Sequence, residues 1–292
     1  MINKNISLKT KLLNLIREVF KIPFFENTLR KILNKNIGYS FFVKLVPNNY
    51  QYKKNSIKHF SYKGINLKLD IHDYVGHYHY FGLKDIEQTN LMRLIKPGDF
   101  VIDIGTNYGT TLLQFANLIG VNGKTFGFEP DPINFEICNQ NIQLNHFTNL
   151  SVENIGLGNK EAEVNLVVDV DSNRGGNRIS ENIIGKESYQ IKIVKFDNWV
   201  LDKMLNKINL IKIDVEGYEM EVLKGAENSI KKYKPILFIE LDDNNLKQQN
   251  SSAKEVISYL ISLNYSIINS LTNKQVNLSD NFLNCHFDII CR

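Results

Sequence analysis

Two short apolar runs of this 292-residue chain end in an acidic residue followed closely by glycine: residues 101–109 (VIDIGTNYG) and residues 211–219 (IKIDVEGYE). A third run, residues 124–129 (KTFGFE), ends in a glutamate. An acid at the carboxyl end of a strand can accept hydrogen bonds from a ligand or take a proton in a reaction. Glycine tolerates positive φ and lets a ligand lie against the backbone where the next helix begins. These residue types therefore predict a nucleotide-like ligand beside a catalytic acid.

The glycine pattern of the first run narrows the choice of ligand. It is G-x-x-x-G, without the middle glycine that accommodates a diphosphate in dinucleotide-binding folds. Asn107 stands at that approach, and its side chain can both donate and accept hydrogen bonds, which suits an amino-acid group. S-adenosylmethionine combines an amino-acid group with an adenosine ribose, so we predict it as the cofactor. An ordinary strand-to-helix turn without a ligand is the alternative.

The predicted binding residues divide between the two ends of this cofactor. Asp103, Gly105, Asn107 and Gly109 are expected to line the methionine end, where Asp103 can accept a hydrogen bond from the amino group. Glu129 is expected to chelate the two ribose hydroxyls, because a carboxylate offers two acceptor oxygens. The alternative for Glu129 is a surface acid that merely follows a strand.

Five segments of the chain resemble the FkbM family of methyltransferases, in family order and over roughly residues 70–292. They are VIDIGTNYGTT, FGFEPDP, NQNIQLN, IKIDVEGYEMEVLKGA and PILFIE. The resemblance implies a class I methyltransferase fold that uses S-adenosylmethionine and usually methylates a hydroxyl oxygen. It also implies adenine contacts near Asn154, and an acceptor hydroxyl on a sugar, a glycolipid or a secondary metabolite.

The catalytic candidates belong to the run at residues 211–219. Asp214 and Glu216 follow a strand at the carboxyl edge of the predicted sheet, where open α/β folds bind substrates, and either could take the acceptor's proton. Lys212 shares a strand face with Asp214. It could pair with Asp214 and keep it ionised, or act as the base if burial lowered its pKa. Capping of the following helix is the alternative role for the two acids.

Acceptor binding is predicted at two further places. Asn173, Arg174 and Arg178 stand in a polar loop that resembles a family segment, where they could bind sugar hydroxyls or an anionic group, or form a solvated turn. Glu240 ends the strand beside that of Asp214 in a sheet of this order. These carboxylates have oxygen ligands for a divalent cation, but no motif of fixed spacing supports one, and no metal is predicted.

Alternating strands and helices predict a doubly wound α/β sheet, mostly parallel, with helices on both faces. Strands are expected at residues 100–103, 124–128, 150–155, 209–214, 235–241, 265–270 and 285–291, with strand-like runs at 164–169 and 190–195. Helices are expected at residues 86–96, 110–119, 132–144, 219–232 and 253–263, and a hairpin at 57–72. The resemblance adds that the last strand is antiparallel.

We expect a basic N-terminal extension, residues 1–70, before a methyltransferase domain, residues 71–292. Residues 1–69 carry 14 Lys and Arg against 2 Asp and Glu, a net charge of +12 that leaves −8 for the remainder. Residues 7–21 show an apolar stripe at helical spacing with a basic opposite face, and Pro23 is expected to end this helix. The helix could contact a membrane surface, or pack on the main domain as a lid, which is the arrangement favoured here.

Composition excludes several classes of function. The acidic main part argues against a nucleic-acid partner, and the three cysteines lack zinc-site spacing and fit a reducing compartment. With no run of about 18 apolar residues and no compact apolar leader, a cytoplasmic or membrane-peripheral protein is expected. The sequence does not indicate an oligomeric state. An NAD-dependent oxidoreductase and a non-catalytic binding domain are the alternative functions, and the missing glycine and the intact acids argue against them.

Overall fold

A computed structural model describes residues 7–168, 173–180 and 187–292. It divides into two compact units. Of the described residues, the N-terminal unit comprises those within 7–62, 66–84 and 173–175, and the sheet unit comprises those within 63–65, 85–168, 176–180 and 187–292. The N-terminal unit runs past residue 70, where the sequence suggested a boundary, because helix α4 (Tyr74–Phe81) packs against strand β1 (Ile57–Tyr62).

The N-terminal unit contains short helices and one hairpin. Its elements are α1 (Leu8–Val19), α2 (Pro23–Asn34), α3 (Tyr39–Phe42), η1 (Val43–Leu45), η2 (Asn49–Gln51), β1 (Ile57–Tyr62), β2 (Ile65–Asp70) and α4 (Tyr74–Phe81). The predicted first helix and the hairpin are present. Pro23 does not end the first helix, which already stops at Val19, but begins α2. Proline is suited to the first helical position because its missing N–H would have no partner there.

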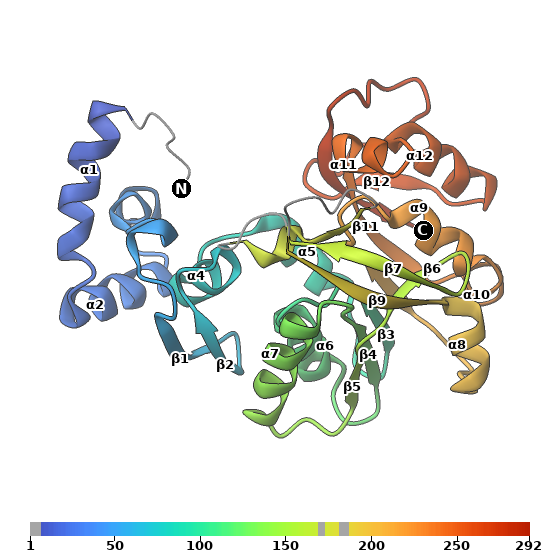
Figure 1. The fold of residues 1–292 in the computed structure, drawn as a ribbon, viewed down its shortest axis with the longest axis horizontal. Helices are drawn as coiled ribbons and strands as arrows, with labels where there is room; N and C mark the ends of the chain where they lie inside the picture. Colours follow the sequence, from blue (N-terminus) through green and yellow to red (C-terminus); the bar gives the residue numbers. More distant parts are fainter. Residues whose placement is uncertain (1–6, 169–172, 181–186) are drawn as a thin grey trace. The chain divides into compact units, whose positions relative to one another are not determined.

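The sheet unit is built on a seven-stranded sheet of order β12-β13-β11-β10-β3-β4-β5 (Figure 1). The strands are β3 (Phe100–Ile104), β4 (Lys124–Phe128), β5 (Leu150–Glu153), β10 (Leu210–Ile213), β11 (Ile236–Asp242), β12 (Ile267–Asn269) and β13 (His286–Cys291). The pairs from β11 to β5 are parallel, and β13 is antiparallel to both of its neighbours. The predicted fold class, mostly parallel with an antiparallel last strand, is confirmed.

Helices cover both faces of this sheet. They are α5 (Ile86–Leu94), α6 (Thr110–Ile119), α7 (Pro132–Gln143), α8 (Phe196–Asp202), α9 (Glu219–Gly225), α10 (Glu227–Tyr233), α11 (Asp243–Gln248) and α12 (Ala253–Ser262). Successive residues of β3 enter separate cores: Val101 belongs to a buried cluster with Leu91 and Phe115, whereas Ile102 belongs to one with Leu223. Strand side chains alternate between faces, so a sheet covered on both sides needs continuous apolar strands. No described helix has the length and apolar character needed to cross a membrane.

A second sheet, of order β6-β9-β7-β8, was not predicted as a sheet. Its strands are β6 (Gly156–Gly158), β7 (Ala162–Val167), β8 (Arg178–Ile179) and β9 (Ser188–Lys195). The short helix η3 (Arg174–Gly176) precedes β8. Helix α9 packs on β6 so closely that a Cβ at Gly225 would lie 1.9 Å from the carbonyl oxygen of Gly158. The predicted helix at residues 219–232 is two helices, α9 and α10, which meet just after this glycine.

Candidate active site

The loop after β3 forms a left-handed, tightly packed turn. Gly105 and Gly109 each have a φ of +80°, and Asn107 has a φ of +50°. A Cβ at Gly105 would lie 1.8 Å from the carbonyl oxygen of Asp214, and a Cβ at Gly109 would lie 2.6 Å from Sγ of Cys138. Packing within the protein therefore requires both glycines, which the sequence had assigned to the approach of a ligand.

A buried oxygen atom beside this loop fits the amino end of S-adenosylmethionine. Within the described ranges, Oδ1 of Asn107 is shielded from solvent and accepts no hydrogen bond. A buried acceptor without a donor costs about 1–3 kcal/mol, so a ligand that brings an N–H group would be favoured here. Asp103 is fully buried nearby, and its Oδ2 accepts a hydrogen bond from Oγ1 of Thr106 at 2.6 Å. These side chains fit the predicted cofactor.

Glu129 follows β4 and holds the same loop. Its side chain is only 5% exposed; Oε2 accepts a hydrogen bond from the backbone N–H of Asn107 at 2.7 Å, and Oε1 accepts one from Asp131 at 2.9 Å. Burial raises the pKa of Glu129 to about 8, against the effect of these two donors. Each carboxylate oxygen retains a second lone pair, so chelation of ribose hydroxyls is compatible with this geometry.

Two residues support the position of Glu129. Asn154, predicted near the adenine, donates from Nδ2 to the carbonyl oxygens of Glu129 at 2.8 Å and Pro130 at 3.1 Å. Asp131, which was not predicted, caps α7 and accepts a hydrogen bond from Nδ2 of Asn177 at 2.5 Å. An aspartate followed by proline is a typical start of a helix, so the sequence did contain a signal for this residue.

Lys212 joins the predicted cofactor loop to the predicted catalytic acids. Its Nζ donates to the carbonyl oxygen of Gly105 at 2.9 Å, and lies 3.1 Å from Oδ2 of Asp214 and 3.4 Å from Oδ1 of Asp103. Burial acts to lower the pKa of Lys212, but the carboxylates of Asp214 and Asp103 outweigh burial and the pKa is raised. Lys212 is therefore held as a cation, which favours the ion-pair role over the role of base.

Three carboxylates crowd together at the carboxyl ends of β10 and β11. One oxygen from each of Asp214, Glu216 and Glu240 lies within 4.8 Å of the others. Asp214 and burial, in that order, raise the pKa of Glu240 well above its usual value, whereas burial and then Asp214 raise the pKa of Glu216 to about 8. Because like charges this close repel one another, Glu216 and Glu240 hold a proton more tightly than free carboxyl groups do. The same three oxygens could instead hold a divalent cation.

Arg178 is the predicted acceptor-binding residue that the structure places near this cluster. Its Nη1 donates to Oδ1 of Asn245 at 3.4 Å, and Nδ2 of Asn245 donates to Oε2 of Glu216 at 2.8 Å. The Arg178 guanidinium also opposes the burial that raises the pKa of Glu216. Asn245 was not predicted. Asn173 and Arg174 belong to the N-terminal unit, and their role stays a prediction.

The loop after β10 is held by Glu219, a residue for which the sequence predicted no role. Oε1 of Glu219, at the start of α9, accepts hydrogen bonds from the backbone N–H groups of Val215 and Gly217, both at 3.1 Å. Glu216 itself adopts a φ of +54°. Glu219 therefore fixes this loop, and the side chain of Asp214 is 40% exposed.

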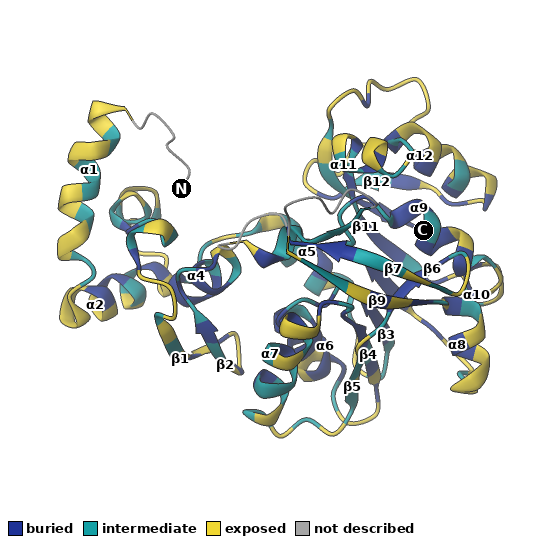
Figure 2. Cartoon of the chain, viewed as in Figure 1, coloured by how far each residue is buried: buried dark blue, intermediate teal, exposed yellow. Residues whose placement is uncertain are grey.

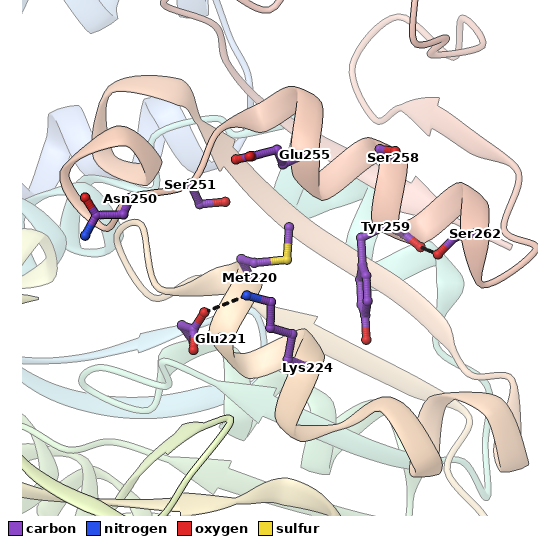
Figure 3. Close-up of a pocket in the computed structure, with 9 residues that line it drawn as sticks. All are labelled: Met220, Glu221, Lys224, Asn250, Ser251, Glu255, Ser258, Tyr259 and Ser262. Atoms are coloured by element: carbon purple, nitrogen blue, oxygen red, sulfur yellow. Dashed lines mark hydrogen bonds and ion pairs between the residues drawn. The ribbon is translucent and has the colours of Figure 1, made fainter.

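A cleft of about 420 Å³ lies between α9 and α12 (Figure 3). Its lining residues are Met220, Glu221, Lys224, Asn250, Ser251, Glu255, Ser258, Tyr259 and Ser262. Among these described lining residues there is none of the predicted site residues, so we do not assign the cleft to the active site.

Comparisons with known proteins find methyltransferases. The hexuronic acid methyltransferase AglP of Haloferax volcanii is 28% identical over 140 residues, which cover 48% of this chain and 55% of the relative. The 2-O-methyltransferase NoeI of Sinorhizobium fredii is 23% identical over 184 residues, which cover 57% of this chain and 73% of the relative. The crystal structure of methyltransferase FkbM from Methylobacillus flagellatus has 17% identity and a TM-score of 0.44, over 75% of this chain and 52% of the other. The chain thus spans about half the length of the first of these relatives.

A family model described as the methyltransferase FkbM domain matches residues 103–267, more than half of the chain. The matched range includes the acids at or after the ends of β3, β4, β10 and β11, from Asp103 to Glu240. The match confirms the predicted family and, with it, S-adenosylmethionine as the cofactor, and it argues against the NAD-dependent alternative. The chain belongs to the family of the methyltransferase FkbM domain.

Proposed function

We propose that this protein is an S-adenosylmethionine-dependent O-methyltransferase whose acceptor is a sugar hydroxyl. The observation that carries the proposal is the position of Lys212, whose Nζ contacts the carbonyl oxygen of Gly105 and the carboxylates of Asp103 and Asp214. One ammonium group thus lies between the loop expected to bind the methionine end and the acids expected to face the acceptor. Transfer of a methyl group between two ligands requires such adjacency.

The residues at the ends of β3 and β4 would hold the cofactor. S-adenosylmethionine supplies, when bound, a methyl group that its sulfonium has already activated. Oδ1 of Asn107 would accept a hydrogen bond from the amino group, and Asp103 would add negative charge nearby. Glu129 would accept hydrogen bonds from the ribose hydroxyls with the lone pairs that the backbone leaves open.

The proton of the acceptor hydroxyl would pass to the crowded carboxylates. We assign the base to Asp214, because its side chain is 40% exposed and its Oδ2 lies 3.1 Å from a permanent cation, Lys212. Glu216 and Glu240, within 4.8 Å of it, would share the proton after transfer. A positioned general base contributes about 10²–10⁴-fold to a rate, and we expect a contribution of this size from Asp214.

The name of one relative favours a sugar as the acceptor, and the name of another favours an oxygen as the methylated atom. One is a hexuronic acid methyltransferase and the other a 2-O-methyltransferase. In this chain Arg178, linked through Asn245 to Glu216, would bind a hydroxyl or a carboxylate of the acceptor. A guanidinium beside the acid cluster therefore supports an acceptor with several oxygen groups rather than an apolar one.

The test is a transfer assay with isotope-labelled S-adenosylmethionine and a panel of hexuronic acids and neutral sugars, alongside calorimetry with S-adenosylhomocysteine. We expect label in at least one sugar and binding of S-adenosylhomocysteine but not of NADH. Binding without transfer to any hydroxylated acceptor would favour a non-catalytic binding domain. Transfer to an amine or thiol but to no hydroxyl would show that the reaction assigned here is wrong.

A further inference from the structure

Helix α1 turns its apolar side away from the rest of the N-terminal unit. Its apolar side chains on one face are between 45% and 75% exposed: Leu8, Leu12, Leu15, Ile16 and Val19. Their spacing of three and four residues puts them on a single stripe of the helix. None of the residues of α1, all of which are described, is buried. In Figure 2 the helix is drawn mainly in the colour of exposed residues.

The polar side of α1 faces the rest of the N-terminal unit. Nε of Arg17 donates to the carbonyl oxygen of Lys44 at 2.9 Å, Nδ2 of Asn14 donates to the hydroxyl of Tyr50 at 3.1 Å, and Nε2 of Gln51 donates to the carbonyl oxygen of Asn14 at 3.2 Å. A surface helix of a soluble protein ordinarily packs its apolar stripe inward. Polar contacts hold α1 in the opposite orientation, which leaves its apolar stripe uncovered within this unit.

Three further exposed apolar residues stand just before α2 and in its first turn. Ile22 is 50% exposed, Phe24 is 73% exposed and Phe25 is 41% exposed. The rings of Phe24 and Phe25 meet edge to face with centroids 5.4 Å apart. Phe is among the residues found on the apolar face of helices that lie in a membrane interface.

Exposed lysines flank the apolar stripe, and the exposed Glu18 lies beside one of them, Lys11. At 100° per residue, the exposed Lys9 and Lys11 fall on opposite flanks of the stripe. The net charge of residues 1–69 is +12, so two copies of this surface would repel each other, whereas anionic headgroups would be attracted. An apolar stripe flanked by lysines is complementary to an anionic bilayer, with the apolar side chains among the acyl chains and the ammonium groups at the phosphates.

We propose that α1 and the first turn of α2 bind the surface of an anionic lipid bilayer, with α1 lying in the plane of the interface. The apolar side chains provide the burial, and the flanking lysines select a negatively charged surface. The proposal rests on the N-terminal unit alone and does not depend on the reaction assigned to the sheet unit.

The test is co-sedimentation of the full chain with vesicles of phosphatidylglycerol and phosphatidylcholine, and with vesicles of phosphatidylcholine alone. We expect sedimentation with the anionic vesicles, and much less with the neutral ones or at high salt. A triple variant, Leu12→Gln, Leu15→Gln and Phe24→Gln, is expected to weaken partitioning by about a hundredfold or more, because three apolar side chains no longer enter the bilayer. Replacing Lys9→Gln and Lys11→Gln together is expected to weaken it by about thirtyfold.

The matched control replaces three equally exposed apolar residues of the sheet unit, Val121→Gln, Leu201→Gln and Met204→Gln, which are 89%, 70% and 87% exposed. This control is expected to sediment like the unmodified chain. The proposal is overturned if the unmodified chain stays in solution with anionic vesicles, or if the α1 variant sediments as well as the control. A dimer in light scattering that the α1 variant abolishes, without vesicle binding by the unmodified chain, would assign the stripe to a second copy. Methyl transfer to a soluble sugar should be the same in all these variants, so the two proposals fail separately.

Discussion

At the end of β4, the carboxylate of Glu129 accepts hydrogen bonds from two backbone N–H groups, whereas at the ends of β10 and β11 the carboxylates of Glu216 and Glu240 face other acids. Both groups of acids follow strands of one sheet, but Glu129 is buried whereas Glu216 and Glu240 are half-buried. The first carboxylate has donors that fix its position, which suits a residue that binds. In the second group the charge of Asp214 is the largest cause of the raised pKa of Glu240 and the second largest, after burial, for Glu216, although Asn245 donates a hydrogen bond to Glu216. Acids that repel one another in this way suit residues that move a proton. Lys212 contacts both Asp103, at the cofactor loop, and Asp214, in the second group of acids.

The largest expected effect on catalysis follows from replacing Asp214, in the group of acids assigned to proton transfer. Asp214→Asn removes the assigned base without changing the size of the side chain, so kcat should fall by about 10²–10⁴-fold while the affinity for S-adenosylhomocysteine stays within a few-fold. Steady-state kinetics and calorimetry measure the two quantities. Asp202→Asn, an exposed acid of α8, is the control. Full activity of Asp214→Asn would assign the proton transfer to another group.

The next largest effect is expected at Lys212, which contacts both the cofactor loop and the acid cluster. Lys212→Met leaves the buried Asp103 carboxylate without its cation, and removing one partner of a buried ion pair typically costs about 3–5 kcal/mol. Urea unfolding should show this loss in the free energy of unfolding. Lys192→Met, at an exposed position of β9, should change it little. A loss below about 1 kcal/mol in the free energy of unfolding would mean that Lys212 does not couple the cofactor loop to the acid cluster.

Glu129 should respond in the opposite way to Asp214. Glu129→Gln keeps one acceptor oxygen but replaces the other with an NH₂ donor, so binding of S-adenosylhomocysteine should weaken by about 10–100-fold, which corresponds to the loss of one or two hydrogen bonds from the ribose hydroxyls. Calorimetry measures this directly. Glu136→Gln, on the exposed side of α7, is the comparison. Unchanged affinity in Glu129→Gln would remove Glu129 from the cofactor site.

A smaller effect, on stability, is expected at Glu216. Its pKa of about 8 lies above the ordinary value of 4.5, so the folded chain binds the proton more tightly than the unfolded chain. This stabilisation is present below pH 4.5 and is lost as pH rises towards 8. Glu216→Gln is always neutral, so it should raise the free energy of unfolding by about 1–2 kcal/mol at pH 8 and leave it nearly unchanged at pH 4.

Thermal or urea unfolding at the two pH values checks this expectation. If Glu216→Gln lowered stability at pH 8, the carboxylate would be stabilised by its neighbours, and the crowding of the acids would have no energetic consequence. The same variant should also flatten any rise of kcat/KM between pH 6 and pH 8, because Glu216 no longer exchanges a proton with Asp214.

The smallest effect is expected on removal of metal ions. If the oxygens of Asp214, Glu216 and Glu240 share a proton rather than a cation, dialysis against EDTA should leave methyl transfer unchanged. Loss of activity that Mg²⁺ or Mn²⁺ restores would contradict this, and would make the three carboxylates ligands instead.

Much of this contrast was visible in the sequence. Continuous apolar runs identify β3, β4, β10 and β11, and an acid lies at or just after the end of each. Both groups of acids could therefore be predicted. The donors could not. Asn245 lies 29 residues from Glu216, and its hydrogen bond depends on how α11 leaves the neighbouring strand. Likewise β6 and β8 have three and two residues, too few for a periodic signal.

The inverted orientation of α1 shows the same limit from another side. The apolar stripe of the helix follows from the spacing of its leucines, and it was predicted. Which side of the helix faces its own unit depends on contacts such as that from Arg17 to the carbonyl oxygen of Lys44, 27 residues away. A hydrophobic pattern alone favours packing inward, so such a helix can be recognised only from its partners.

The most direct test of the central claim is a crystal structure with S-adenosylhomocysteine, read for the position of its sulfur. We predict that the ribose lies on Glu129, that the amino group lies at Asn107, and that the sulfur faces Asp214 across Lys212. A ligand bound in the cleft between α9 and α12, or with its sulfur turned away from the three carboxylates, would contradict the account.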